Sequence, residues 1–478
     1  MSTKNHEYTK IKNPEGGLHE RNNKSRKYFL RQLFISSGLW TPFFSVGLCM
    51  GTPTVYVPQA RREANSTDAV SAEMASWLSS AFGYAAIPAV FLLAYLTVRI
   101  GRKSTFNIVS LNMVLVATSY YLSTTPTHIL ITEILQGIPH ACSVSTSIIA
   151  LVEYTSPENR GLMLTIKSAT VFWGIWVANA IGAYTSWRYI CAVSYINAFY
   201  SITSVFWPES PVWLASKGRF DECRQSYRWL RGWSEASEKE LDELIKMQKD
   251  KLKIEQPKSL KSIFRFLSVK EFYKPIFLAS LMIVIYHLSG KQVFTMYVID
   301  IIKKITKSES TAYNGMLILD GVSILSMYTG CILARFLRRR VMLFVFAPLA
   351  VLFLFIMSLY LYLVSLTVLI ENKYISMFLL VGFSIAIGLG PMILATSLYG
   401  ELIPTNYKGQ SVLIISLIFT IIQSTVLKTS PYGFIVLGMH GMILFYGISV
   451  SVCLVVLYKY LPETKDKTLL EIEEHFKK

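Results

Sequence analysis

The sequence predicts an all-α membrane protein with twelve transmembrane helices, arranged as two pseudo-symmetric six-helix bundles. The first observation is compositional, because 52% of the 478 residues are hydrophobic and only 16% are charged. That balance is too apolar for an ordinary soluble domain. The second observation is a series of twelve long apolar stretches, and the third is that three short motifs each recur, in the same order, about 240 residues later.

The apolar stretches have the length of membrane-spanning helices. A helix needs about 20 apolar residues to cross the hydrocarbon core of a bilayer. The stretches lack the alternation of apolar and polar residues that the strands of a membrane β-barrel show. We expect spans at roughly 34–57, 76–98, 105–123, 128–152, 162–184, 188–207, 275–299, 312–334, 341–364, 374–400, 409–427 and 434–460.

The repeated motifs indicate that the first six spans are related to the last six. Many secondary transporters place two such halves around a substrate site near the bilayer midplane. The sequence therefore predicts membrane transport. The pairs are Glu153-x6-Arg160-Gly161 with Glu401-x6-Lys408-Gly409, Arg99-x-Gly101-Arg102-Lys103 with Arg335-x-Leu337-Arg338-Arg339, and Pro208-Glu209-Ser210 with Pro462-Glu463-Thr464.

The distribution of charge predicts the orientation in the membrane. The net charge is +17, and Lys and Arg concentrate in the N-terminal tail, around 99–103, in 217–273 and around 335–340. An even number of spans puts these segments on one side, which the positive-inside rule makes the cytoplasm. Lys303, Lys304 and Lys307 fall on the other side and count mildly against this orientation. The charge thus favours contact with anionic lipid and not with nucleic acid.

The domain plan follows from these spans. We expect a cytoplasmic tail at 1–33, bundles at 34–207 and 275–460, a cytoplasmic linker at 208–274 and a second tail at 461–478. The N-terminus lacks the apolar core of a cleavable signal peptide, so the first span should direct insertion. Five of the six cysteines fall inside spans, and no extracellular disulfide is expected.

Two loop motifs add detail. Asn65-Ser66-Thr67 lies in the first outer loop and is a candidate glycosylation acceptor. Ser237-Glu238-Lys239-Glu240 in the linker has the form of a helix capping box and predicts a short amphipathic helix. The linker has no catalytic or metal-ligand pattern, and we expect neither an enzyme nor a cofactor.

Several motifs resemble the sugar-porter family of the major facilitator superfamily. Pro208–Leu214 is similar to the family's PESPRWL, and Pro462–Leu469 to its PETKGKTL. The Glu153–Gly161 spacing and Trp229–Gly232 are most similar to the insect facilitated trehalose transporter subgroup. The resemblance covers almost the whole chain from about residue 34. It implies the major facilitator fold and alternating access.

The charged motifs at the cytoplasmic helix ends are interpreted as a latch. Carboxylates and cations there could form an ion-pair network between the bundles that breaks when the carrier opens inward. Exposed ion pairs contribute only about 0–1 kcal/mol each, so such a latch would have to be a network. The alternative is that the cations are membrane anchors. The predicted latch residues are Arg99, Arg102, Lys103, Glu153, Arg160, Glu209, Arg335, Arg338, Glu401 and Lys408.

The chain departs from the family pattern at this latch. Val98 and Ala334 stand where acids are expected, and Val212 replaces an arginine. Fewer acids should weaken the latch and favour the outward-facing state less than in relatives.

The resemblance also implies a substrate site. The family's Gln-Gln-Leu-Ser-Gly-Ile-Asn in span seven is replaced by Tyr286–Gln292, which removes both glutamines. A desolvated sugar needs hydrogen-bond partners for its hydroxyls. The predicted substrate-binding residues are Ser168, Tyr286, His287, Gln292, Tyr297 and Thr396.

Four ionisable residues lie within predicted spans, where charge is costly and usually paired or functional. Glu133 and His140 share span four, whereas Lys291 and Asp320 should lie at nearly the same depth in spans seven and eight. The Lys291–Asp320 pair could be structural, or either residue could contact substrate. His287 could equally be a packing residue or a ligand.

The sequence thus predicts a monomeric plasma-membrane carrier for facilitated diffusion of a sugar, either a hexose or a disaccharide such as trehalose. The first span contains no acid, whereas proton-coupled relatives usually carry an aspartate there. A proton-coupled symporter remains an alternative, because Glu133 or Asp320 could bind the proton. A second alternative is a nutrient receptor with a carrier fold that does not transport.

Overall fold

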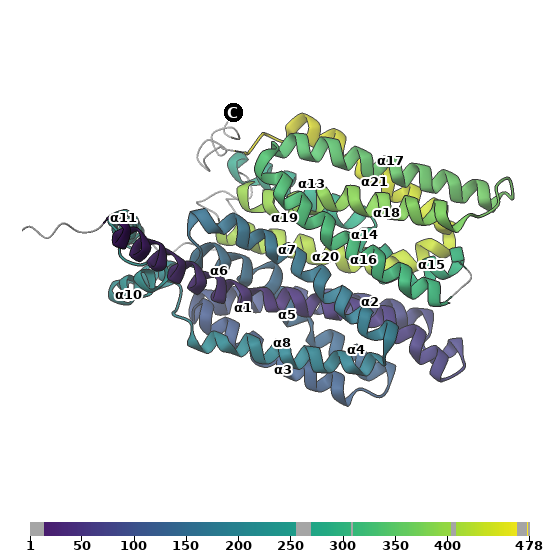
Figure 1. Cartoon of the computed structure of the whole chain (residues 1–478), viewed down its shortest axis with the longest axis horizontal. Coiled ribbons are helices and arrows are strands. Elements are labelled where there is room, and N and C mark those ends of the chain that lie inside the picture. Colours follow the sequence, from purple (N-terminus) through teal and green to yellow (C-terminus); the bar gives the residue numbers. More distant parts are fainter. Residues whose placement is uncertain (1–13, 255–268, 307–308, 403–407, 466–475, 477–478) are drawn as a thin grey trace, which may run out of the picture.

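The computed structural model describes residues 14–254, 269–306, 309–402, 408–465 and 476 (Figure 1). Twelve helical segments in this part of the chain are long and apolar enough to cross a membrane, and each overlaps a predicted span. The all-helical, twelve-span fold class is therefore confirmed. The segments are Arg26–Glu63, Ala72–Arg99, Arg102–Leu122, Pro126–Tyr154, Pro157–Tyr184, Trp187–Phe206, Phe272–Met296, Ala312–Phe336, Arg339–Ser365, Lys373–Ala395, Gly409–Val436 and Gly438–Tyr460.

The two halves of the chain form two bundles that lie side by side, the first purple to teal and the second green to yellow in Figure 1. The first contains α1 (Pro14–Glu63), α2 (Ala72–Arg99), α3 (Arg102–Leu122), α4 (Pro126–Leu135), α5 (Gly137–Val144), α6 (Thr146–Tyr154), α7 (Pro157–Tyr184) and α8 (Ile190–Ile202). The second contains α13 (Lys270–Leu288), α14 (Lys291–Met296), α15 (Val298–Thr306), α16 (Glu309–Phe336), α17 (Arg339–Ser365), α18 (Lys373–Leu389), α19 (Pro391–Leu402), α20 (Lys408–Val436) and α21 (Gly438–Tyr460).

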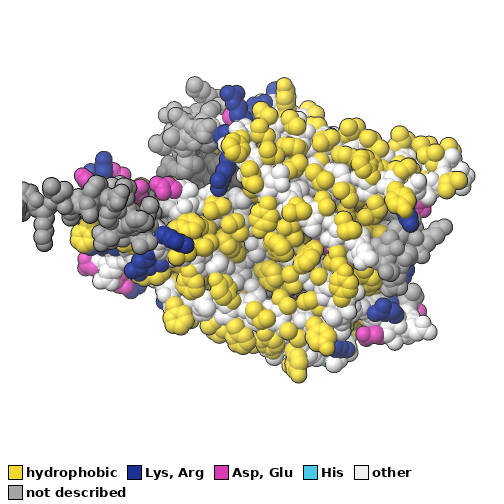
Figure 2. Space-filling model, in the orientation of Figure 1, with side chains coloured by type: hydrophobic (Ala, Val, Ile, Leu, Met, Phe, Trp, Pro, Cys, Tyr) yellow, Lys and Arg dark blue, Asp and Glu magenta, His cyan; other side chains and the backbone are white. Residues whose placement is uncertain are grey.

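The surface of these bundles matches a bilayer. Figure 2 shows hydrophobic side chains over the middle of the visible face, with Lys and Arg towards its two ends. We call the end that carries the α2–α3 and α16–α17 turns the basic end, and the opposite one the far end. The exposed apolar residues between them are those expected to face lipid, for example Phe91, Leu111 and Leu352.

Two spans are interrupted near the middle of the molecule. The fourth divides into α4, α5 and α6, and the seventh breaks between α13 and α14 at Ser289 and Gly290. Gly290 has φ +77°, and a Cβ there would lie 2.5 Å from the Tyr446 ring. Only glycine satisfies both conditions. Discontinuous helices place side chains and free backbone groups at a transporter's binding site.

The two bundles touch each other along α2 with α20 and along α7 with α16. Hydrogen bonds cross this interface at several depths. Near the far end, Thr54 Oγ1 donates to the Met296 carbonyl (3.0 Å). Ser416 Oγ donates to the Val144 carbonyl (2.7 Å), closer to the basic end. The bundles are therefore in contact on both sides of the midplane.

The linker folds into three helices at the basic end: α9 (Pro211–Ser216), α10 (Phe220–Arg231) and α11 (Glu235–Ile254). They enclose a separate small hydrophobic cluster that includes Trp213, Cys223 and Leu241. Burial raises the pKa of the Cys223 thiol to about 11, which leaves it a packing residue.

The predicted helix in the linker exists, but the predicted start was wrong. α11 begins at Glu235, two residues before the Ser237 proposed as its cap. Ser234 and Ser237 instead exchange backbone-to-side-chain hydrogen bonds of 3.0 and 3.1 Å. The second serine therefore takes the place that a glutamate has in the usual capping box.

Candidate functional site

Arg102 and Glu153 form the centre of a polar cluster at the basic end. Arg102 Nε donates to Glu153 Oε2 and Nη2 donates to Oε1, both at 2.8 Å. Ser210 Oγ also donates to Glu153 Oε2 (2.5 Å). The Arg102 and Glu153 side chains are only 15% and 6% exposed. A two-point pair in this environment is stronger than an exposed ion pair, because water competes less for the charges.

Glu209 caps the neighbouring helix. The backbone N–H groups of Arg102 and Lys103, which begin α3, both donate to Glu209 Oε1 (2.9 and 3.1 Å). Gly101 has φ +100°, and a Cβ there would lie 2.2 Å from the carboxylate. A carboxylate at a helix N-terminus satisfies free N–H groups and the helix dipole. The basic-end cluster thus consists of Arg102, Glu153, Glu209 and Ser210, and it joins α3, α6 and the start of α9.

The second half repeats this cap. The N–H groups of Arg339 and Arg340, which begin α17, donate to the two oxygens of Glu463 (3.0 and 3.1 Å). Arg339 Nη1 donates to the Ala334 carbonyl (2.6 Å), just as Arg102 Nη1 donates to the Thr97 carbonyl (3.2 Å). The two halves are therefore related at these turns in detail.

This correspondence corrects the sequence alignment of the second basic motif by one residue. α2 ends at Arg99 and α3 begins at Arg102, whereas α16 ends at Phe336 and α17 begins at Arg339. Arg339, and not Arg338, is the equivalent of Arg102. The second-half counterpart of Val98 is then Arg335, and not Ala334. Three consecutive arginines at 338–340 hid the register in the sequence.

The predicted ion-pair network between the bundles is not what the described residues form. Their ion pairs all lie within the first half and the linker. Arg99 lies over the Tyr95 ring, and Arg160 forms no ion pair with any described residue. Arg335 and Arg338 are exposed. The Glu401 and Lys408 side chains lie outside the described part of the structure, so their predicted role stays a prediction.

Three of the predicted substrate residues lie together at the break in span seven. His287 Nδ1 and Gln292 Oε1 are 2.9 Å apart, across the Ser289–Gly290 turn. The Tyr286 ring packs edge-on against the His287 ring at 5.0 Å. All three side chains are buried. Tyr286 and His287 also contact Phe419 of α20.

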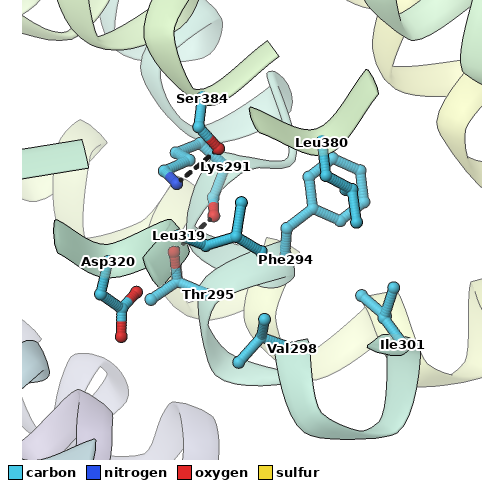
Figure 3. Close-up of a pocket in the computed structure, with 9 residues that line it drawn as sticks. All are labelled: Lys291, Phe294, Thr295, Val298, Ile301, Leu319, Asp320, Leu380 and Ser384. Carbon is cyan, nitrogen blue, oxygen red and sulfur yellow. Dashed lines mark hydrogen bonds between the residues drawn. The ribbon is translucent and has the colours of Figure 1, made fainter. Parts of the chain in front are cut away.

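Lys291 and Asp320 line one small cavity of about 10 Å³, shown in Figure 3. The predicted direct ion pair between them is wrong, since no N–O distance in the pair falls within ion-pair range. Lys291 Nζ instead donates to Ser323 Oγ and Ser384 Oγ (2.7 and 3.1 Å). Equal depth along two helices did not mean contact, because it leaves the direction of each side chain undetermined.

Asp320 has its partner in the other bundle. Asn179 Nδ2 on α7 donates to Asp320 Oδ2 on α16 (2.6 Å), and both residues are buried. This bond crosses the α7–α16 interface. Asp320 is thus poised to report, through one hydrogen bond, whether these two helices are together.

Glu133 is enclosed within the first bundle. Cys49 Sγ donates to its Oε2 (2.6 Å), and Tyr120 Oη donates to its Oε1 (2.7 Å). The side chain is completely buried. Two hydrogen bonds from α1 and α3 therefore satisfy this carboxyl group without a cation.

The other predicted substrate residues lie at different levels. Tyr297 lines a cavity of about 230 Å³ near the far end, between α1, α2, α15 and α20. Ser168 is half-buried on α7, and its Oγ donates to the Leu164 carbonyl (3.4 Å). The Thr396 side chain lies outside the described part of the structure. The structure therefore groups the span-seven residues and separates Tyr297 from them.

Lys167 was missed at the sequence level. It lies inside the predicted span 162–184, and its ammonium group stands 5.3 Å from the centre of the Phe43 ring. The side chain is buried, with no hydrogen-bond or ion-pair partner among the described residues. The search for ionisable residues within spans, which identified Lys291, should have included it.

Comparison with known proteins agrees with this geometry. Residues 36–476 match the family described as Sugar (and other) transporter. The chain is 24% identical over 419 residues to a facilitated trehalose transporter, Tret1, of Apis mellifera ligustica, covering 87% of this chain and 82% of that one. It is 26% identical over 348 residues to Tret1 of Bombyx mori, covering 70% and 66%.

Solved structures with a similar fold are sugar transporters of the major facilitator superfamily. The proton:xylose symporter XylE bound to 6-bromo-6-deoxy-D-glucose has a TM-score of 0.77 and 16% identity, covering 95% of this chain and 99% of that one. The inward open conformation of XylE from E. coli has a TM-score of 0.71 and 15% identity, covering 92% and 98%. At such identities the likeness concerns the fold alone. The family match over nearly the whole length is what decides, and the chain belongs to the sugar (and other) transporter family.

Proposed function

We propose that this protein carries an uncharged sugar across the plasma membrane by facilitated diffusion, with the two bundles rocking around a central site. The observation that carries the proposal is the polar group at the break in span seven. His287 and Gln292 are buried at the interface of the two bundles and bonded to each other. Imidazole and amide groups suit sugar hydroxyls, since each offers a donor or an acceptor without a net charge.

The named relatives suggest the kind of sugar. Both are facilitated trehalose transporters, so trehalose and hexoses are the first candidates. The experiment is uptake of radiolabelled trehalose and D-glucose into proteoliposomes that contain the purified full-length protein. The proposal expects saturable uptake that excess unlabelled sugar inhibits. Uptake no faster than in protein-free liposomes, for every sugar and polyol of a panel, would overturn it.

The basic end is proposed to face the cytoplasm, because Lys and Arg cluster there. The basic-end cluster would then stabilise the first bundle on that side, and the Glu463 cap would do the same for the second. These two rigid turns would let each bundle move as a unit. The second half of the predicted latch, Glu401 and Lys408, would complete the arrangement.

A proton-coupled symporter is a second candidate, and the Asn179–Asp320 bond favours it. Asp320 is a buried carboxyl group whose printed hydrogen bond crosses the moving interface. Protonation of such a group would change the strength of a contact that the transport cycle breaks. The two functions differ in a single respect, namely whether sugar uptake requires or moves protons.

A further inference from the structure

The middle of the molecule contains several buried polar atoms that have no partner among the described residues. They are Nδ1 and Nε2 of His140, Nε2 of His287 and Oε1 of Gln423. The three side chains are 2%, 0% and 2% exposed. Native proteins pair nearly all such atoms, so a group of four in one region requires an explanation.

These side chains come from both bundles and meet around one aromatic ring. His140 is on α5, His287 on α13, and Gln423 and Phe419 on α20. The Phe419 ring centre lies 4.4 Å from that of His287 and 6.4 Å from that of His140. Gln423 follows Phe419 by one helical turn and approaches the His140 ring without a hydrogen bond to it.

Their depth is that of a transporter's central site. His140 lies midway along Pro126–Tyr154, and Gln423 lies in the middle of Gly409–Val436. His140 also packs edge-on against Phe82 of α2, with ring centres 5.2 Å apart. The aromatic neighbours thus hold the imidazole in place while leaving both of its nitrogens unpaired.

We propose that His140, His287 and Gln423 form a hydroxyl-binding subsite shared by the two bundles, which Phe419 fills in the present conformation. This inference rests on the proposed sugar transport and assigns residues to it. A neutral imidazole presents one donor and one acceptor, and a sugar hydroxyl is both. The ligand class is therefore an uncharged polyol or sugar whose hydroxyls pair with these atoms when the Phe419 ring moves aside.

The test uses two substitutions that keep shape but remove hydrogen bonding. His140→Phe retains a ring against Phe82 and Phe419, and Gln423→Leu retains an apolar chain of similar size. In proteoliposomes, each should raise the half-saturating concentration of the transported sugar, D-glucose or trehalose, about tenfold, which is the effect of one lost hydrogen bond. His128→Phe and Gln410→Leu, at exposed positions of the same spans, are matched controls expected to transport normally.

Thermal unfolding without sugar separates this role from a structural one. Removing a buried, unpaired polar group should leave the midpoint unchanged or raise it. We therefore expect both variants to be at least as stable as the wild type while binding sugar more weakly. A lower midpoint together with unchanged affinity would mean that His140 and Gln423 only support the fold, and the subsite would be rejected.

Deoxy sugars supply the sharpest comparison. Among 2-, 3- and 6-deoxyglucose as competitors, one should inhibit the wild type about tenfold more weakly than glucose, yet inhibit His140→Phe as well as glucose does. The same deoxy pattern in both proteins overturns the subsite and leaves sugar transport intact. If the wild type takes up no sugar at all, the proposed function fails and the subsite with it. If His140→Phe does not fold, Gln423→Leu alone decides.

Discussion

Arg102 holds Glu153 through two parallel hydrogen bonds of 2.8 Å, in a nearly buried environment at the basic end. Breaking one partner of such a pair leaves the other charge without compensation. We predict that Arg102→Gln or Glu153→Gln lowers the free energy of unfolding by about 2 kcal/mol. The double variant should lose about 1 kcal/mol less than the two single losses combined. Unfolding of the purified protein in detergent measures this.

The exposed pair Arg219–Glu222 provides the control for this cycle. Its side chains are 49% and 52% exposed, so Arg219→Gln should not change the unfolding midpoint measurably. Strictly additive losses at Arg102 and Glu153 would show that their contact contributes nothing as a pair.

A second prediction concerns the hydrogen bond between Asn179 and Asp320. We expect Asn179→Ala and Asp320→Ala to be coupled by about 1 kcal/mol in the unfolding free energy, because they share one buried bond. Coupling between Lys291→Met and Asp320→Ala should be smaller, since Lys291 donates to Ser323 and Ser384. The reverse order would restore the direct Lys291–Asp320 pair.

The far end contains a cation–π contact between the bundles. Lys428 Nζ of α20 lies 3.8 Å from the centre of the Trp77 ring of α2, and Ser76 Oγ donates to the Lys428 carbonyl (2.9 Å). We predict that Trp77→Leu loses about 1 kcal/mol of this contact and favours opening at the far end. A cysteine at Ser79, which lines the far-end cavity, should then react faster with a maleimide. Trp77→Phe should have a smaller effect, and equal rates in all three proteins would argue against a closing role.

A fourth prediction tests the orientation. Asn65 is exposed in the turn after α1, in a left-handed conformation with φ +48° that asparagine tolerates well. If the far end faces the outside, protein from a eukaryotic membrane should carry a glycan at Asn65. Endoglycosidase should reduce its mass, and Asn65→Gln should abolish that shift. A mass that enzyme treatment leaves unchanged, together with labelling of Asn65→Cys only after permeabilisation, would reverse the topology.

Much of the fold followed from the sequence because hydrophobic length is a one-dimensional property. Apolar runs located all twelve spans, and the paired motifs located the α2–α3 and α16–α17 turns. What failed depended on direction. The register of Arg338–Arg340, the start of α11 and the supposed Lys291–Asp320 contact all required knowing where a side chain points. Neighbouring helices settle that, and periodicity along one helix does not.

The candidate site was predictable to a similar extent. The family motif in span seven led to Tyr286, His287 and Gln292, which the structure brings together. Gln423 and Phe419 match no motif and matter only because α20 packs beside α5 and α13. Lys167, by contrast, was visible in the sequence as a lysine within an apolar span.

The central claim is carrier-mediated sugar movement without proton coupling. The most direct measurement is radiolabelled sugar uptake into proteoliposomes, with and without a proton uncoupler, alongside a recording of internal pH. We predict saturable uptake with the same initial rate in both conditions and no change of internal pH when sugar is added. Uptake that collapses with the uncoupler, or sugar-driven acidification of the lumen, would contradict facilitated diffusion and assign the protein as a proton symporter.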